Sequence, residues 1–357
     1  MVKEMIEVRE IRNPQVWDSA LLSLPTNHVL QSWSWGEFKA DYGWTATRLL
    51  FIQEGQVRAA AQVLRRQLPH LPLAVMYVPK GPAMDYDDST LLEAVLARLE
   101  ALARRGRAIF IKIDPDVCST GDGEPHPVVA ALARHGWRYS AEQIQFPNTM
   151  LVDLARDEDG TLAAMKSKTR YNVRLAARRG VTVRLGSVDD LPLFYHLYNE
   201  TSQRDGFLIR PYAYYEDAWG SFLKAGRAQL LLAEHEGDML AGLILFFFGK
   251  TAWYMYGASG SDKRALMPNH LLQWEAMRWA RAQGCLVYDM WGAPNVLDES
   301  DPMWGVYRFK AGFGGQFIRR IGAYDYPSWR PLYWAYTVLM PRYLDFLRRR
   351  HRQPALD

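Results

Sequence analysis

The stretch QLLLAEHEGDMLAGLILFFFGKTAWYMY, residues 229–256, decides the fold that we predict for this chain. Two apolar runs flank Glu236-Gly237, and this spacing is typical of a β-hairpin with a tight turn. Residues 252–256 form a further apolar run and predict a third strand. Working outward from there, residues 270–283 show helical periodicity, and 287–291 predict one more strand.

The first half of the chain repeats this order of elements. A hairpin is predicted over 48–64, with Glu54-Gly55 at its turn, and an apolar strand over 73–78. Helical periodicity over 91–105 then precedes a short buried strand at 108–113. Strands that alternate with helices predict α/β or α+β layers, and the repeated order predicts two units of similar topology.

The length of the chain also favours two domains. Its 357 residues exceed what one hydrophobic core usually serves. We place domain 1 at residues 1–150 and domain 2 at residues 151–323. The remaining segment, 324–357, contains a helix-like stretch, and we expect it to return to domain 1 and complete it.

Composition and motifs exclude several classes of protein. The net charge of +4 is mild for a dedicated DNA-binding protein, yet it suits an enzyme that handles anionic substrates. No glycine motif for nucleotide or dinucleotide binding occurs, and the histidines and two cysteines lack metal-ligand spacing. We therefore expect neither a cofactor nor a metal. The charged N-terminus and the lack of an 18-residue apolar run predict a cytoplasmic protein.

The stretch MKSKTRYNVRLAARRGVTV, residues 165–183, contains many cations and no acid. As a helix continued from Leu162, it would have an apolar face beside a row of like charges at i,i+4 spacing. Each such pair costs roughly a few tenths of a kcal/mol. We interpret the row as a surface for a phosphate backbone, and the alternative is a solvated face near acids from elsewhere in the fold. The candidate residues are Lys166, Lys168, Arg170, Arg174 and Arg178.

Two charged residues stand at positions that suit catalysis. Lys310 follows Phe309 among glycines and aromatic residues, and a lysine against such low-dielectric walls can stabilise an oxyanion strongly. Asp114 follows an apolar strand and precedes a proline, where a carboxylate can orient or deprotonate an amine. The alternatives are a surface lysine in a hairpin and an aspartate that caps the following turn.

Three further residues are candidates for binding an anionic substrate. Arg210 and Tyr214 are four residues apart, so on one helix face their side chains would point together. Arginine is the preferred residue for bidentate recognition of phosphate or carboxylate groups. Tyr256 could add a phenolic hydrogen-bond donor.

Five motifs follow one another between about residues 27 and 323. They are QSWSWGEFK (31–39), IKIDPDV (111–117), KSKTRYNVRLAARRGV (166–181), YDMWG (288–292) and RFKAGFGG (308–315). In order and spacing the set resembles the Fem peptidyltransferases, the FemA, FemB and FemX enzymes of peptidoglycan interpeptide bridge formation. Residues 184–229 lack the sustained heptads of a coiled-coil arm, so the chain resembles the shorter FemX type.

The resemblance implies two GNAT-like domains that flank a cleft, the first completed by the C-terminal segment. It implies an aminoacyltransferase with an aminoacyl-tRNA as donor and UDP-MurNAc-pentapeptide or lipid II as acceptor. Lys310, beside Phe309, would stabilise the oxyanion, and Asp114 would lie near the acceptor amine. The residues implied to contact the acceptor are Lys39, Arg210, Tyr214 and Tyr256.

Two other functions compete with this interpretation. An acyl-CoA-dependent GNAT N-acyltransferase would hold the CoA pyrophosphate on a glycine-rich loop before a helix. Here Leu266, Met267, Pro268 and Asn269 stand where glycines would be needed. A non-enzymatic RNA-binding module around residues 166–184 would leave the candidate catalytic residues without a role, and no RNA-binding motif supports it.

The C-terminal stretch 326–352 mixes aromatic residues with arginines. Both residue types suit a membrane interface, so a peripheral contact with the inner membrane face is one interpretation. In the other, the aromatic residues pack on domain 1 and the arginines keep the chain end soluble, because Pro331 and Pro341 interrupt any long helix. We expect a monomer in either case.

Overall fold

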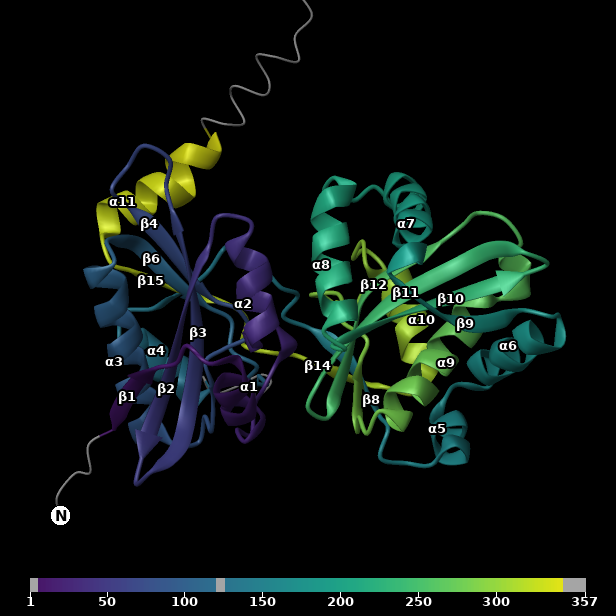
Figure 1. Cartoon of the computed structure of the whole chain (residues 1–357), viewed down its shortest axis with the longest axis horizontal. Helices are drawn as coiled ribbons and strands as arrows, with labels where there is room; N and C mark the ends of the chain where they lie inside the picture. Colours follow the sequence, from purple (N-terminus) through teal and green to yellow (C-terminus); the bar gives the residue numbers. More distant parts are fainter. Residues whose placement is uncertain (1–5, 120–125, 343–357) are drawn as a thin grey trace, which may run out of the picture. The chain divides into compact units, whose positions relative to one another are not determined.

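The computed structural model describes residues 6–119 and 126–342, which form two compact units (Figure 1). Each unit is a mixed sheet with helices packed against it, and this confirms the predicted α/β fold class. The first unit contains residues 39–143 and the segments before residue 27 and after residue 320. The second contains residues 144–320 and the short segment 27–38.

The first unit contains an eight-stranded sheet. Its strands are β1 (Glu7–Glu10), β2 (Thr45–Gln53), β3 (Gln56–Gln67), β4 (Ala74–Val78), β5 (Ala83–Met84), β6 (Ala108–Ile113), β7 (Arg138–Tyr139) and β15 (Tyr324–Pro327). They are ordered β1-β2-β3-β4-β6-β15-β7, with β5 paired to β3. β4 and β6 run parallel, because helix α3 (Ser89–Arg105) carries the chain back between them. β15 pairs antiparallel with β6 and β7, so residues after 320 complete this sheet.

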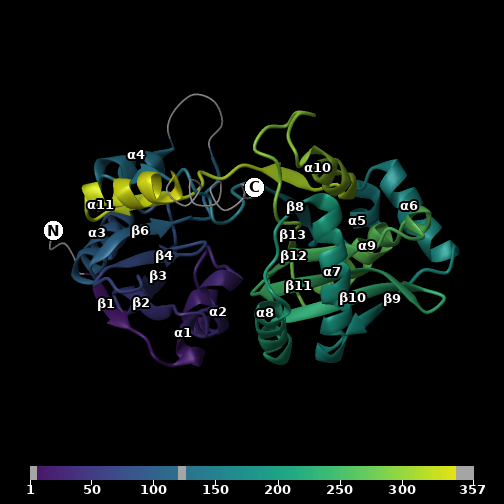
Figure 2. The same cartoon turned by 90° about the horizontal axis from the view of Figure 1, so that it is seen from above.

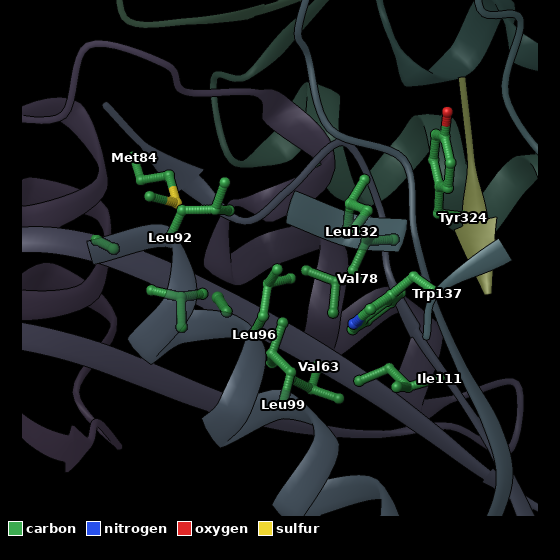
Figure 3. Packing of buried hydrophobic residues seen from close by; sticks show 14 of the residues in the cluster. Val63, Val78, Met84, Leu92, Leu96, Leu99, Ile111, Leu132, Trp137 and Tyr324 are labelled. Carbon is green, nitrogen blue, oxygen red and sulfur yellow. The ribbon is translucent and has the colours of Figure 1, made fainter. Parts of the chain in front are cut away.

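Helix α3 contributes many side chains to the hydrophobic core of the first unit, in agreement with the periodicity of its apolar residues. Leu92, Leu96 and Leu99 are at most 3% exposed and pack with apolar residues of the sheet (Figure 3). Burying each of these leucines contributes roughly 1.5–3 kcal/mol. Three further helices of this unit are α1 (Pro14–Leu22), α4 (Pro127–Arg134) and α11 (Arg330–Trp334).

The second unit contains a seven-stranded sheet. Its strands are β8 (Thr149–Asp153), β9 (Thr182–Gly186), β10 (Ala228–His235), β11 (Asp238–Phe248), β12 (Thr251–Ser259), β13 (Val287–Asp289) and β14 (Gln316–Ile318), in the order β14-β8-β13-β12-β11-β10-β9. Its helices include α5 (Glu158–Ala164), α6 (Ser167–Arg178), α7 (Leu191–Asp205), α8 (Tyr212–Lys224), α9 (Pro268–Ala282) and α10 (Trp304–Lys310). β12 and β13 run parallel with α9 between them. Each unit therefore has a hairpin, a strand, a helix and a parallel strand in that order.

Segment 27–38, which we predicted as part of domain 1, groups with the second unit. The ring of His28 lies 4.4 Å from that of Trp253, and the ring of Phe38 in helix α2 (Trp33–Ala40) lies 5.2 Å from that of Tyr214. These aromatic contacts explain the grouping, because residues 27–38 bury their rings against side chains of the second unit.

The basic stretch does not form one continuous helix with the residues before it. Helix α5 ends at Ala164 and α6 begins at Ser167, so the prediction of one apolar face beginning at Leu162 is wrong. Arg170 stabilises the corner between the helices, because its guanidinium donates to the carbonyls of Ala163, at 3.0 Å, and Met165. The buried face of α6 consists of Thr169, Asn172, Val173 and Ala176.

The C-terminal segment packs on the first unit as far as the structure describes it. The ring of Tyr333 lies 5.6 Å from that of Phe110 in β6, and α11 lies near β6 in both views (Figures 1 and 2). Trp329 and Trp334 are more than half exposed. The predicted membrane contact includes residues 343–352, which lie outside the described residues, so it stays a prediction. Within 6–119 and 126–342, no helix combines the length and apolar character needed to cross a membrane.

Candidate active site

Lys310 is the last residue of α10 and is only 6% exposed. Its Nζ donates hydrogen bonds to the carbonyl oxygens of Trp291, at 2.5 Å, and Gly292, at 2.7 Å. The ring centroid of Tyr254 lies 5.7 Å from Nζ, which is a cation–π distance. Backbone and aromatic groups therefore enclose this lysine, and the alternative of a surface lysine in a hairpin is wrong.

The two carbonyls reach Lys310 because the backbone bends after β13. Trp291 has a φ of 55° and Gly292 a φ of 26°. A tryptophan with positive φ is rare, so the surrounding structure holds this bend against a local cost of roughly 1–3 kcal/mol. A Cβ atom on Gly292 would crowd the ring of Phe146. This bend is also why β13 ends at Asp289 and is shorter than the predicted strand.

Asp289 provides a negative charge near Lys310. Its carboxylate is buried and accepts hydrogen bonds from the backbone N–H of Trp291, at 2.7 Å, and from the Thr149 hydroxyl. Arg320 Nη2 lies 3.6 Å from its second oxygen. Burial lowers the pKa of Lys310 to about 7, although the charge of Asp289 opposes this shift. Lys310 therefore gains and loses its proton near neutral pH.

Phe309 packs against a neutral histidine. Its ring lies 5.2 Å from the rings of both His270 and Phe313. Burial, and to a lesser extent the charge of Lys168, lower the pKa of His270 to about 4, so the imidazole is uncharged at physiological pH. Asn172 Nδ2 donates a hydrogen bond to His270 Nε2 at 3.2 Å. Helices α6 and α9 therefore meet beside Phe309.

The glycine-rich loop after Lys310 holds the N-terminus of α6. The backbone N–H of Lys166 donates to the carbonyl of Gly312 at 2.9 Å. A Cβ atom on Gly312 or on Gly314 would overlap atoms of α6 or of the residue that ends α5, and Gly314 has a φ of 77°. The GFGG sequence thus permits a close approach of two backbones. This approach attaches the basic helix to the element that carries Lys310.

Asp114 follows β6 in the first unit and is 4% exposed. Its carboxylate accepts hydrogen bonds from the Tyr77 hydroxyl, at 2.7 Å, and from the backbone N–H of Lys80. Burial raises the pKa of Asp114 to about 6, against the opposing effects of Lys80 and Tyr77, and the charge of Asp116 adds to the rise. Asp114 is thus a buried carboxyl group that titrates near neutral pH, and the cap of the following turn is not its role.

Arg210 precedes α8, so the prediction that it shares one helix face with Tyr214 is wrong. The two side chains nevertheless meet, because the Cζ atom of Arg210 lies 4.6 Å from the Tyr214 ring centroid. Tyr256 of β12 is in the same surroundings: burial and then Tyr214 raise the pKa of its phenol, while the Arg210 charge opposes the rise. Three of the four residues predicted to contact the acceptor therefore lie together in the second unit.

The fourth of these residues, Lys39, lies in the last turn of α2 and is partly buried. It groups with the first unit, whereas the preceding residue, Phe38, groups with the second. The Phe38 ring contacts Tyr214 at 5.2 Å. The helix that carries Lys39 therefore also supplies an aromatic contact to Tyr214, the ring beside Arg210.

The cations of α6 face solvent. Lys166, Lys168, Arg174 and Arg178 are exposed, and none of them forms an ion pair with an acidic residue that the structure describes. The alternative of acids supplied by other parts of the fold thus has no support in the described ranges. Arg170 is anchored to the corner between the helices. Ser167, Arg170, Tyr171, Arg174, Ala177 and Arg178 line a shallow groove of about 700 Å³.

The loop before α9 is unsuited to binding CoA. Met267 has a φ of 60°, and the helix begins with Pro268, which has no backbone N–H. Arg179 of the basic stretch donates to the carbonyl of Ala265 in this loop at 3.0 Å. A pyrophosphate needs successive N–H groups at the start of a helix, so these residues disfavour the acyl-CoA alternative.

The sequence-based prediction missed three residues of this site. Asp289 and Trp291 lie in the motif YDMWG, 288–292, and the structure places both beside Lys310. An acid at the end of a buried strand, with a tryptophan two residues later, is a signal that could have identified them. His270 gives no such signal, because its partners Asn172 and Phe309 come from other helices.

Comparison with known proteins agrees with this fold and these motifs. A family model described as the FemAB family matches residues 22–238 and 233–340. A lipid II:glycine glycyltransferase of Staphylococcus epidermidis is 28% identical to this chain, and the alignment covers 94% of the chain and 96% of that protein.

Two solved structures show the same architecture. The crystal structure of FemX matches with a TM-score of 0.83 at 28% identity, covering 92% of this chain and 98% of FemX. A tandem GNAT protein from the clavulanic acid biosynthesis pathway matches with a TM-score of 0.54 at 14% identity, covering 91% and 99%. At that identity the second protein is similar in fold alone, and it confirms the GNAT-like architecture.

Proposed function

Since this chain belongs to the FemAB family and is an acyltransferase, we propose that it transfers an amino acid from an aminoacyl-tRNA to the stem-peptide amine of a peptidoglycan precursor. The relative that acts as a lipid II:glycine glycyltransferase favours lipid II over UDP-MurNAc-pentapeptide as the acceptor. The observation that carries the proposal is the enclosed Lys310, which can be cationic in surroundings that contain little water.

The reaction needs a positive charge where the ester carbonyl becomes an oxyanion. The acceptor nitrogen attacks the ester carbon, a C–N bond forms, and the ribose oxygen leaves as the C–O bond breaks. The Lys310 ammonium would stabilise the negative charge that develops, and a single charge acts more strongly in an enclosed site than in bulk water. The ring of Tyr254 and the low exposure of Lys310 keep this site apolar.

The attacking amine must also lose a proton. We assign this step to Asp114, because a carboxylate with a pKa near 6 is ionised at pH 7 and still basic enough to accept a proton. Its hydrogen bonds from Tyr77 and the Lys80 backbone hold the carboxylate in one orientation. The amine loses one proton and the ribose oxygen gains one proton as it leaves, so the number of protons is unchanged over the reaction.

The exposed cations of α6 support a tRNA donor. A row of lysine and arginine side chains that the described acids do not neutralise suits a phosphate backbone. The N-terminus of this helix is attached to the loop after Lys310. A tRNA on α6 would therefore be held by the same unit that carries the proposed oxyanion-stabilising residue.

Reversing the charge of Arg174 and Arg178 should weaken tRNA binding. The variant Arg174→Glu/Arg178→Glu is expected to flatten the dependence of log Kd on log salt by about 1 for each phosphate that the protein no longer neutralises. Filter binding or fluorescence anisotropy of tRNA over a salt series measures this slope. Lys224→Glu/Lys250→Glu changes two exposed lysines of the same unit and should leave the slope unchanged. Undiminished binding by the arginine variant would mean that the row is only a solvated face.

Arg210, Tyr214 and Tyr256 are proposed to bind the anionic groups of the acceptor. The guanidinium lies against the Tyr214 ring, which orients its fork, and the two tyrosines provide phenolic donors. A membrane-borne acceptor also fits the exposed Trp329 and Trp334, since such rings suit the membrane interface.

Arg210→Ala should raise the KM for the acceptor by about 10- to 150-fold, the range expected for losing a charge-assisted hydrogen bond. The KM for charged tRNA should change little. Steady-state kinetics with each substrate varied in turn separates the two effects. Arg156→Ala removes a surface arginine of the same unit and serves as the control. An equal rise in both KM values would argue against a specific acceptor site.

A further inference from the structure

One large aromatic side chain interrupts the cationic surface of α6. Tyr171 is 56% exposed, and the ring contact found for it in the described part of the chain is with Arg178, whose Cζ atom lies 5.9 Å from the ring centroid. A single exposed tyrosine needs no explanation in itself. Here, however, the ring lines the groove of about 700 Å³ together with Arg174 and Arg178.

An aromatic ring between arginines suits an unpaired nucleotide. The base can stack on the ring while guanidinium groups contact the adjacent phosphates, and the stacking tolerates any base. A double-stranded segment keeps its bases inside the helix, so it would use the cations and leave the ring without a role. The groove therefore has the chemistry of a site for single-stranded nucleic acid.

The groove begins close to the proposed catalytic element. Ser167, the first residue of α6, lines it, and the adjoining Lys166 N–H donates to Gly312 in the loop after Lys310. Tyr171 is four residues further, which is about 6 Å along the helix axis. The part of an aminoacyl-tRNA that must reach Lys310 is its unpaired 3′ end, which carries the ester.

We propose that Tyr171 is a stacking platform for an unpaired nucleotide near the 3′ end of the donor tRNA, an inference that rests on the proposed function. Arg174 and Arg178, which line the groove with the ring, hold the flanking phosphates. The ring thereby directs the 3′ end along α6 toward the loop that contains Gly312. Tyr171 is a positioning residue, and it takes no part in the chemical step.

The test compares intact uncharged tRNA with the same tRNA lacking its unpaired 3′ nucleotides. Tyr171→Leu should bind intact tRNA about 5- to 150-fold more weakly than the natural protein, which is the range for losing one base–aromatic stack. Tyr171→Phe keeps the ring and should bind within about twofold of the natural protein. The salt dependence should be unchanged in both variants, because no charge is altered. Tyr139→Leu, a change at a 59% exposed tyrosine of the first unit, is the control.

For the shortened tRNA, Tyr171→Leu and the natural protein should bind equally, because the stacked nucleotide has been removed. Unchanged binding of intact tRNA by Tyr171→Leu would overturn the inference and leave the proposed tRNA donor intact. An equal loss for both tRNAs would also overturn it, since the ring would then contact the duplex or support the fold. If the natural protein bound neither tRNA, the donor assignment itself would fail.

Discussion

Lys310→Met is expected to lower kcat by roughly 100- to 1000-fold when both substrates are saturating, as the loss of one oxyanion donor does in other enzymes. The KM values should change little, because the proposed interaction with the oxyanion forms only in the transition state. Methionine is of similar length and suits the enclosed position, since the ring of Tyr254 lies beside the end of the side chain. Single-turnover measurements with charged tRNA give the rate of the chemical step directly.

Two controls make this result interpretable. Lys224→Met changes an exposed lysine of the same unit and should keep the full kcat. Thermal unfolding of Lys310→Met should remain cooperative, because the Asp289 carboxylate keeps its hydrogen bonds from Thr149 and Trp291. A variant that folds normally and retains its kcat would remove Lys310 from the mechanism.

Asp114→Asn is expected to lower kcat/KM by roughly 100- to 10,000-fold, the usual contribution of a positioned general base. The pH dependence should change as well. Because the pKa of Asp114 is raised to about 6, the carboxylate is present above pH 6, and activity falls as the pH drops through this value. Asp114→Asn should lose this acid limb. The acceptor amine titrates identically in both enzymes, so the ratio of their rates isolates the effect of Asp114.

The alkaline side of the profile reports on Lys310. Its pKa is lowered to about 7, so its positive charge is present below pH 7 and is lost as the pH rises through this value. When the rate is divided by the fraction of acceptor amine that is deprotonated, the result should therefore be highest between about pH 6 and 7.

Asp116→Asn provides the control for the Asp114 prediction, because removing this negative charge should lower the pKa of Asp114 and move the acid limb to lower pH. An acid limb that persists in Asp114→Asn would assign it to another group.

The secondary structure was predictable wherever a local signal decides it. The hairpin turns at Glu54-Gly55 and Glu236-Gly237 are correct, because successive residues with positive φ favour that tight turn. The helix over 91–105 is confirmed as α3, since its periodicity matches the face that it buries. The start of α6 was not predictable, because a tertiary hydrogen bond from Lys166 to Gly312 helps to place it.

The site could be predicted only in part for a related reason. Lys310 and Asp114 stand out in the sequence, yet their low exposure comes from the tertiary fold. The carbonyls that bind Lys310 point toward it because Trp291 adopts a φ that its residue type disfavours, and no propensity predicts this. Arg210 was predicted to lie on the same helix as Tyr214, but that helix, α8, begins only at Tyr212. The predicted proximity of the two side chains is nevertheless correct.

The most direct test of the proposed function is transfer by the purified full-length chain. A mixture of charged tRNAs would be supplied with lipid II in vesicles, and the acceptor would be analysed by mass spectrometry. We predict that the mass of the acceptor increases by one amino-acid residue at the stem-peptide amine. This increase should require intact aminoacyl-tRNA, and acyl-CoA should not substitute for the aminoacyl-tRNA. An unchanged mass of lipid II and of UDP-MurNAc-pentapeptide with every charged tRNA, or a product formed from acyl-CoA, would contradict the proposal.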